Sequence, residues 1–499
     1  MIKQAIILAA GVGSRLRPIT NEKPKCLVEV NGVPLLEHMV NNLLENGIDK
    51  ITIVCGYKGE LIKEYCHKIF PDRNFNFINN KDYSTSNNLY SLYLASEAFK
   101  EGSFLMNADI IFDSSVLALM QKTDDSCVAV DTSQYIEESM KVTVTEESIS
   151  SISKKITESD AYGCSIDLYK FTKSDAKIIL NKTNEILDGG GINEWTEVAL
   201  DTLFTSGQLE TVPLDINKGR WFEIDTIEDL VEAEILFNKH LSKIKDKKVF
   251  FADNDGTLSV GGTLFETAKS FLSDFPVDKL LYILTNNSSK TDDDIISFLE
   301  KQDVKTDKLR TLISTLPATL FLKKNKISKL FWVANESVGN WLLEQGFIFD
   351  DKNPEAVLLC YDNSISYDKI VKLTEFVRND VAYYATHTDL VCPVEGGYLP
   401  DIGSFIQMIA NATGKRPIKE FGKPNPDFVL PVLEDLGLMP DDAVVIGDRL
   451  YTDIELGKRA NITTVLVLSG EMTRAKYEFE STKADIVVPD VGRLSAFVD

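Results

Sequence analysis

Two aspartates one residue apart, Asp253 and Asp255, stand near the middle of the chain, directly after the apolar run 249–252. Such a run predicts a buried strand, so both carboxylates would lie at the end of that strand. One carboxylate of such a pair can attack phosphorus while its neighbour moves the proton, with a metal ion close to both. The pair therefore predicts phosphoryl transfer, and it leaves open what the preceding half of the chain does.

A glycine-rich segment with cations follows the first apolar run, residues 3–10. Gly11 and Gly13 would let backbone N–H groups approach a phosphate, and Arg15 and Lys25 add positive charge. The third glycine of the dinucleotide fingerprint and the Gly-Lys-Ser/Thr ending of the P-loop are absent. We expect this segment to bind a triphosphate, and the alternative is a strand-to-helix turn with exposed cations.

Strand-like and helix-like segments alternate in both halves, which predicts an α/β fold built on doubly wound, mostly parallel sheets. Between 125 and 220 the pattern is more β-like and irregular. A charged connector at 243–248 separates the two series. We predict two α/β domains in tandem, at 1–243 and 244–499, and the second of them carries an inserted α/β cap.

The composition excludes several classes of function. The chain has 499 residues and a formal charge of −23, which argues against nucleic acid or an anionic membrane as a partner. No apolar run reaches about 18 residues, so we expect no insertion into a membrane. The 7 cysteines are dispersed without a metal or disulfide spacing, which favours reduced thiols and a cytoplasmic location. A homodimer is possible.

The glycine-rich segment carries a family resemblance. Residues 11–16 with 22–25 resemble the signature of the nucleoside-triphosphate transferases that make sugar nucleotides and CDP-alcohols, and residues 1–240 fit throughout. Segments 86–91, 107–109, 191–195 and 221–225 are most similar to the bacterial phosphocholine cytidylyltransferase branch. This resemblance implies CTP as the substrate, a small phosphorylated alcohol as the acceptor, release of pyrophosphate, and Mg²⁺.

The resemblance also implies roles for individual residues. Lys25 would contact the acceptor phosphate and the α-phosphate, and Arg15 would hold the leaving pyrophosphate. Carboxylates at strand ends would hold Mg²⁺, although one of them, Asp225, could cap a helix instead of, or in addition to, binding the metal. The implied metal ligands are Asp109, Glu223 and Asp225. The implied nucleotide-binding residues are Leu8, Ala9, Ala10, Gly11, Gly13, Ser14, Tyr57, Ser86, Asn87 and Asn88.

Residues for the acceptor come from the same motifs. Aromatic rings could form a wall around a quaternary ammonium group. An ordinary place in the hydrophobic core is the alternative for each ring. The candidate acceptor-binding residues are Tyr90, Glu194, Trp195 and Trp221.

Four segments of the second half, taken in order, resemble the motifs of the haloacid dehalogenase superfamily of phosphohydrolases. They are 253–257, 284–288, 422–424 and 444–453, within a resemblance that covers about 248–499. It implies that Asp253 becomes an aspartyl phosphate, that Asp255 is the acid and base, and that Thr285 and Lys423 neutralise the phosphoryl group. The implied Mg²⁺ ligands are Asp253, Asp255 (through its carbonyl), Asp448 and Asp453, and the alternative role for Asp453 is to orient Lys423.

The long stretch between the second and third motifs predicts a cap domain over the site. We place the core at 248–290 and 416–499 and the cap at 291–415. The cap resembles the large α/β type, whose members hydrolyse small phosphate esters such as nitrophenyl phosphate and phosphoglycolate. His387 would lie in a substrate-reading loop, or alternatively in a capped turn.

The two resemblances together predict a bifunctional enzyme, a CTP-dependent cytidylyltransferase fused to a Mg²⁺-dependent phosphatase. One alternative is a sugar-1-phosphate nucleotidyltransferase that uses another nucleoside triphosphate. A second alternative is a sensor or scaffold whose domains only bind ligands.

Overall fold

The computed structural model describes residues 2–216, 218–307, 309–394 and 397–498. It divides into two compact units, Met1–Phe237 and Asn238–Asp499. The predicted boundary at 243/244 lies slightly too late, because the 3-10 helix η3 (Leu241–Asp246) belongs to the second unit and buries Leu241 and Ile244. The Asn238 amide also donates to the backbone carbonyl of Asp485.

The sheet of the first unit is centred on β1 (Gln4–Ala9), which runs parallel to β4 (Lys50–Cys55) and β6 (Ser103–Asn107). The edge strand β5 (Phe75–Asn79) is parallel to β4. Beyond β6 the sheet becomes mostly antiparallel, with β12 parallel to β8 at its edge, which accounts for the irregular pattern expected there. That part contains β8 (Cys127–Asp131), β9 (Lys141–Thr145), β10 (Ser148–Ser153), β11 (Gly163–Phe171) and β12 (Val212–Asp215).

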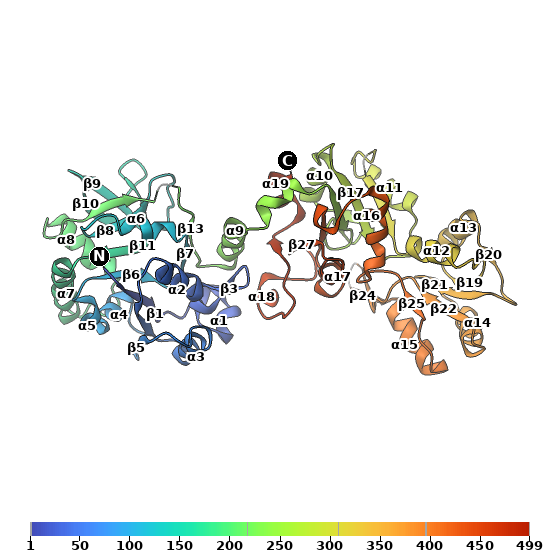
Figure 1. The fold of residues 1–499 in the computed structure, drawn as a ribbon, viewed down its shortest axis with the longest axis horizontal. Coiled ribbons are helices and arrows are strands. Elements are labelled where there is room, and N and C mark those ends of the chain that lie inside the picture. The colour runs from blue at the N-terminus through green and yellow to red at the C-terminus, as the bar shows by residue number, and fades with distance from the viewer. Residues whose placement is uncertain (1, 217, 308, 395–396, 499) are drawn as a thin grey trace. The chain divides into compact units, whose positions relative to one another are not determined.

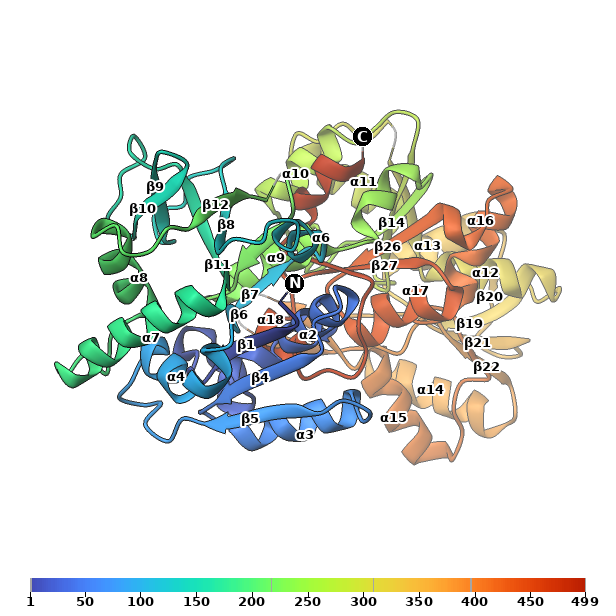
Figure 2. The same ribbon diagram turned by 60° about the vertical axis from the view of Figure 1, so that its left-hand side comes forward.

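Helices lie on both sides of the first unit's central strands (Figures 1 and 2). On one side, Leu92 and Phe99 pack with Ile6 and Leu105 of the sheet in one apolar cluster. That side holds α4 (Asn88–Leu94), α5 (Ser96–Phe99) and α7 (Lys173–Asp188), and α2 (Leu35–Glu45) lies on the other. The remaining elements are η1 (Ser14–Leu16), α1 (Ile19–Glu22), η2 (Lys25–Leu27), β2 (Glu29–Val30), β3 (Val33–Pro34), α3 (Gly59–Ile69), β7 (Ile110–Phe112), α6 (Ser115–Met120), α8 (Thr196–Thr205), β13 (Trp221–Glu223) and α9 (Ile227–Phe237).

The core sheet of the second unit is parallel throughout and centred on β14 (Val249–Asp253). Its order is β18 (Leu309–Ile313), β17 (Leu280–Thr285), β14, β26 (Ala443–Gly447), β27 (Thr463–Val467) and β28 (Ile486–Val488). Because the strands are parallel, Asp253, Thr285 and Asp448 meet at one edge of the sheet.

A second parallel sheet forms the inserted cap. Its order is β20 (Ile348–Phe349), β19 (Lys329–Val333), β21 (Ala356–Leu359), β22 (Ala382–Ala385) and β25 (Lys419–Glu420). The predicted cap limits of 291 and 415 are both wrong. At the start, α11 (Asp292–Lys301) leads into β18, which pairs with β17 of the core. At the end, β25 pairs with β22 of the cap.

Helices of the second unit flank both sheets. The cap holds α12 (Thr315–Lys324), α13 (Glu336–Glu344), α14 (Tyr367–Arg378), α15 (Ile402–Thr413) and the hairpin of β23 (Val391–Val394) and β24 (Gly397–Pro400). The core holds β15 (Ser259–Val260), β16 (Thr263–Leu264), α10 (Glu266–Ser273), η4 (Pro426–Phe428), α16 (Leu430–Leu436), η5 (Pro440–Asp442), a π-helical turn η6 (Leu450–Ile454), α17 (Glu455–Ala460), α18 (Arg474–Tyr477), η7 (Val491–Leu494) and α19 (Ser495–Val498). Every helix in the described ranges falls short of the length and apolar character needed to cross a bilayer.

Because each unit has its own core, a cavity in one core should destabilise that unit alone. Phe251 in β14 is fully buried, so Phe251→Ala should cost the second unit about 3–5 kcal/mol. In a denaturant titration of the full chain we expect two transitions, of which one shifts, whereas Leu105→Ala in β6 should shift the other. Val277→Ala, at a side chain that is 77% exposed, is the control. A single transition that moves with both core substitutions would contradict two independent cores.

Candidate active sites

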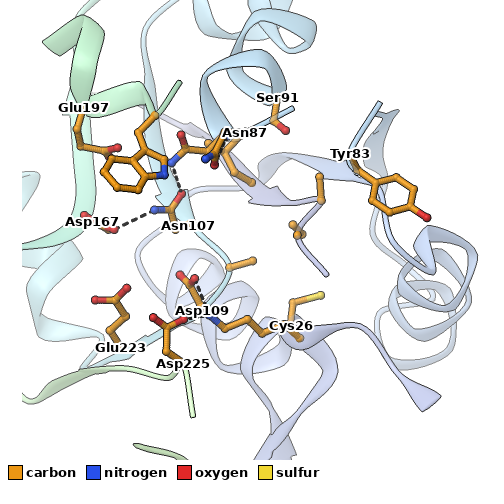
Figure 3. Close-up of a pocket in the computed structure, with 18 of the residues that line it drawn as sticks. Cys26, Tyr83, Asn87, Ser91, Asn107, Asp109, Asp167, Glu197, Glu223 and Asp225 are labelled. Carbon is orange, nitrogen blue, oxygen red and sulfur yellow. Dashed lines mark hydrogen bonds and ion pairs between the residues drawn. The ribbon is translucent and has the colours of Figure 1, made fainter. Parts of the chain in front are cut away.

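The first unit has a cavity of about 300 Å³ at the carboxyl edge of its parallel strands (Figure 3). The loop after β1 forms one wall, and the segment that begins α4 forms another. Most of the predicted residues line it. They are Leu8, Ala9, Ala10, Gly11, Arg15, Lys25, Ser86, Asn87, Asn88, Asp109, Trp195, Glu223 and Asp225.

Lys25 is the central cation of this cavity. Its Nζ lies 2.8 Å from Asp109 Oδ2 and 2.6 Å from Asp225 Oδ1. Burial opposes the charge of Lys25, but the two carboxylates outweigh it and raise the pKa of the ammonium. Arg15 Nη1 lies 3.1 Å from Asp225 Oδ2, with its side chain largely exposed. Gly13 has a φ of 64°, and a Cβ there would approach Lys25 Cβ to 2.9 Å, so the glycine keeps room for the lysine.

Asp109, Glu223 and Asp225 come together because β13 pairs with β7, where Glu223 lies opposite Ile110. Each can bring one carboxylate oxygen to a common point, with these atoms within 4.8 Å of one another. Asp109 Oδ1 is buried without a hydrogen-bond partner, and burial followed by the charges of Asp109 and Asp225 raises the pKa of Glu223 to about 7. An oxygen-rich, mutually repelling cluster of this kind fits a hard divalent cation.

The helix-capping alternative for Asp225 is not what the structure has. The Thr226 hydroxyl accepts from the backbone N–H of Asp229 at 3.1 Å, and the Asp229 carboxylate accepts from the N–H of Thr226 at 2.7 Å. Asp225 therefore has its carboxylate free to face Lys25 and Arg15 in the cavity.

Several predicted residues lie outside the lining of the cavity. Trp221 is 4% exposed, and its indole N–H donates to Asp131 Oδ2 at 2.7 Å, so it is a core residue. The Tyr57 hydroxyl donates to the carbonyl of Thr20 and anchors the loop, and the Tyr90 hydroxyl donates to Asp82 Oδ2 at 3.3 Å. The predicted residues outside the lining are Gly13, Ser14, Tyr57, Tyr90, Glu194 and Trp221.

The cavity is also lined by polar residues that were not among the predicted site residues, although Ser91 and Asn107 lie within the motif segments. Asn80 directly follows β5, so its position at a strand end was a usable signal. Asp167 lies in the middle of β11 with a φ of 55°, a left-handed conformation that no sequence pattern announces. The additional polar lining residues are Asn80, Tyr83, Ser91, Asn107, Lys154, Asp167 and Glu197.

A hydrogen-bond network joins some of these residues on one side of the cavity. Asn107 Nδ2 donates to Asp167 Oδ2 at 2.9 Å, and the Tyr169 hydroxyl lies 3.1 Å from Asp167 Oδ1 and 2.8 Å from Glu197 Oε1. Burial, followed by the charges of Glu197 and Glu223, raises the pKa of Asp167 well above its usual range. Figure 3 shows Asp167, Glu197 and Glu223 on the opposite side of Asp109 and Asp225 from Tyr83.

The second unit has a smaller cavity, of about 30 Å³, between the edge of the core sheet and the cap. Lys423 contacts the carboxylate of Asp253, and its Nζ lies 2.6 Å from Asp453 Oδ1. Burial opposes the charge, but these two carboxylates raise the pKa of Lys423, so the side chain is an ammonium ion. Asp255 and Thr285, the predicted acid and one of the predicted phosphoryl-binding residues, also line this cavity.

Asp448 lies beside two glycines that leave it room. A Cβ on Gly256, which has a φ of 94°, would lie 2.3 Å from Asp448 Oδ2, and one on Gly470 would lie 2.1 Å away. Asp448 Oδ1 is buried without a hydrogen-bond partner, and burial followed by the charge of Asp453 raises the pKa of Asp448 to about 6. Asp253, Asp448 and Asp453 can bring oxygens within 4.8 Å of one another, which again fits a divalent cation.

Asn286 connects the parts of this second site. Its Oδ1 accepts from the backbone N–H of Lys423 at 2.8 Å, and its Nδ2 donates to Asp389 Oδ1 at 3.0 Å. Asn286 thereby links the end of β17 to the loop that carries Lys423 and to Asp389 of the cap. Since Asn286 is adjacent to Thr285, its place in the motif was a signal for this role.

Cap residues close the cavity above Asp253. They are Asp389, Val391, Cys392 and Asp401, with Arg449 from the core. His387 is buried behind them, with Nδ1 3.9 Å from Asp389 Oδ2 and Nε2 3.6 Å from Asp401 Oδ1. Its contacts place it behind the carboxylates that line the cavity rather than in the lining itself.

Comparisons with known families agree with this division. The model of the MobA-like NTP transferase domain matches residues 5–151. The models of the haloacid dehalogenase-like hydrolase and HAD-hydrolase-like families match residues 250–348 and 420–494.

Similar proteins are found for the second unit. An acid sugar phosphatase of Staphylococcus saprophyticus is 27% identical over 254 residues, 50% of this chain and 98% of that protein. A dihydroxyacetone phosphatase of Corynebacterium glutamicum is 31% identical over 238 residues, 47% of this chain and 86% of that protein. The solved 4-nitrophenylphosphatase of Thermotoga maritima is 32% identical and covers 51% of this chain and 99% of its own, with a TM-score of 0.49.

A lysine held between carboxylates at a sheet edge is thus present in each unit, within a nucleotidyltransferase-type fold in one case and a phosphatase-type fold in the other. The chain carries a MobA-like NTP transferase domain in its first unit and belongs, through its second unit, to the haloacid dehalogenase-like hydrolases, and it is an enzyme with nucleotidyltransferase and phosphomonoesterase activities.

Proposed function

We propose that the first unit transfers CMP from CTP to a small phosphorylated alcohol, with formation of a CDP-alcohol and release of pyrophosphate. The observation that carries this proposal is the position of the Lys25 ammonium, which lies 2.8 Å from Asp109 and 2.6 Å from Asp225. The glycine-rich loop after β1 lines the same cavity. An ammonium and a carboxylate cluster at one point are what a reaction between phosphates requires. The choice of CTP rests on the cytidylyltransferase-like motifs of the sequence.

In this reaction an oxygen of the acceptor phosphate attacks the α-phosphorus of CTP, and the bond to the pyrophosphate oxygen breaks. Lys25 stabilises the charge that develops between the two phosphates, and Arg15 at the cavity mouth holds the leaving pyrophosphate. Asp109, Glu223 and Asp225 would hold Mg²⁺, which supplies positive charge to the phosphate oxygens.

We propose that the second unit hydrolyses a small phosphate ester through an aspartyl phosphate. Asp253 Oδ attacks phosphorus while Asp255 protonates the leaving alcohol, and Asp255 then takes a proton from the water that releases inorganic phosphate. Lys423 and Thr285 neutralise the transferred phosphoryl group. Asp253, Asp448 and Asp453 would hold Mg²⁺, which adds charge stabilisation.

The cytoplasm is the compartment we propose for both reactions. The seven cysteines form no disulfide, and six of them are buried, which is typical of a protein kept under reducing conditions. CTP is also available there.

Two substitutions should separate the activities. Lys25→Ala should lower nucleotidyl transfer by about a hundredfold or more, because the main positive charge at the reacting phosphates is lost. Asp253→Asn should abolish phosphate-ester hydrolysis, because the amide is not a nucleophile. Pyrophosphate and phosphate release from the full chain measure the two reactions. Loss of both activities in either variant, with the fold intact by circular dichroism, would contradict two separate sites.

A screen of nucleoside triphosphates against acceptors tests the proposed substrates. The full chain with Asp253→Asn should be used, because the second unit could otherwise hydrolyse the acceptors. We expect pyrophosphate release with CTP and a phospho-alcohol. A preference for another nucleoside triphosphate with hexose 1-phosphates would favour the sugar-1-phosphate nucleotidyltransferase instead.

Removal of divalent cations should stop both reactions, because each carboxylate cluster would be left with uncompensated charge. Chelation by EDTA should abolish the release of pyrophosphate and of phosphate, and added Mg²⁺ should restore both. Asp448→Asn should raise the Mg²⁺ concentration for half-maximal hydrolysis by about tenfold or more without affecting nucleotidyl transfer. Hydrolysis that persists after chelation would contradict the proposed role of the Asp253 cluster.

A further inference from the structure

We propose that the acceptor of the first unit carries hydrogen-bond donors, either hydroxyl groups or a primary ammonium, at the end remote from its phosphate. Asp167 and Glu197 would accept these hydrogen bonds. The inference rests on the proposed nucleotidyl transfer and names the chemistry of its second substrate. It disfavours a methylated quaternary ammonium, which has no N–H to donate.

The positions of the lining residues indicate which side of the cavity binds the nucleotide and which side binds the acceptor. The reacting phosphates must lie at Lys25 and its two partners, Asp109 and Asp225. Figure 3 shows these two carboxylates next to each other. Tyr83 lies to one side of this point, and Asn87 and other polar residues at the start of α4 provide groups for the base and ribose. The side that holds Asp167 and Glu197 remains for the acceptor.

Asp167 and Glu197 are suited to accept hydrogen bonds from a ligand. The hydroxyl of Tyr169 lies within reach of both carboxylates but has a single proton, so it can satisfy only one of them at a time. Asn107 supplies one further donor to Asp167. Asn88 likewise gives a side-chain hydrogen bond to Glu197. Burial raises the pKa of both groups, but a carboxyl group that holds a proton keeps acceptor positions on its oxygens, so lone pairs remain for a ligand in the cavity that both residues line.

Within the described part of the chain, the aromatic residues predicted for the acceptor do not form a cage for a quaternary ammonium. Trp221 is buried and bonded to Asp131, and Tyr90 lies outside the lining. Trp195 does line the cavity, but Lys154 Nζ lies 5.5 Å from the centre of its ring. A second cation at the same ring would meet the charge of that ammonium.

The test measures pyrophosphate release by the full chain carrying Asp253→Asn, at saturating CTP. The acceptors are glycerol phosphates, phosphoethanolamine and phosphocholine. We expect kcat/KM for a glycerol phosphate or for phosphoethanolamine to exceed that for phosphocholine by about a hundredfold or more. The reason is that a site lined by hydrogen-bond-accepting carboxyl groups rejects a substrate that has no hydrogen-bond donor. The better of the two identifies hydroxyl or ammonium as the donor. Preference for phosphocholine would overturn the proposal.

Isosteric variants test the two carboxylates. Glu197→Gln and Asp167→Asn should each raise the acceptor KM by about tenfold or more and leave the CTP KM within about twofold. Glu185→Gln, the same change at an exposed position of α7, is the control for the loss of one negative charge. An unchanged acceptor KM in both variants, or an equal rise in the CTP KM, would overturn the assignment.

Calorimetry separates a failure of this inference from a failure of the proposed function. If no nucleoside triphosphate gives turnover, the nucleotidyl transfer is wrong, and the affinities of the same phosphate esters for the Asp253→Asn chain still decide the inference. Tighter binding of glycerol phosphate or phosphoethanolamine than of phosphocholine, weakened by Glu197→Gln, supports it. The opposite order contradicts it.

Discussion

An ammonium held between two carboxylates, partly buried in the first unit and buried in the second, is the interaction on which both halves of this protein depend. Lys25 joins Asp109 to Asp225 in the first unit, and Lys423 joins Asp253 to Asp453 in the second. In each case the partners come from segments far apart in the chain. In the second unit, where all three side chains are buried, removal of one partner should cost about 3–5 kcal/mol, because the other charge stays buried without compensation. In each unit, the lysine and its two carboxylate partners therefore line the site and also hold together the segments that form it.

The edges of the sheets explain why these charges can gather. Parallel strands deliver their carboxyl ends to one edge, where the polypeptide turns away and leaves space for a ligand. In the second unit the space is narrow, and Gly256 and Gly470 keep room for Asp448. In the first unit the antiparallel pairing of β13 with β7 brings Glu223 to the same edge. The two units thus reach a similar arrangement of charges through different topologies.

Much of each site could be predicted, because its residues follow apolar strands or lie in short motifs. Asp109, Asp253 and Asp448 belong to this group. Trp221 shows the limit of prediction from motifs, because an aromatic residue within a motif can instead pack in the hydrophobic core. Its burial and its hydrogen bond to Asp131 show that Trp221 does so. Asp167 was missed because its left-handed backbone interrupts the alternation of β11. The cap limits were missed since pairing, not composition, assigns β18 to the core and β25 to the cap.

The central claim is that one chain holds a nucleotide-dependent site and a separate phosphatase site. The most direct measurement is the stoichiometry of CTP binding to the full chain in the presence of Mg²⁺, by isothermal titration calorimetry. We expect one CTP per chain, bound in the first unit, with the same affinity in the Asp253→Asn variant and with greatly weakened binding in Asp225→Asn. Absence of CTP binding, or binding that depends on Asp253 rather than Asp225, would contradict it.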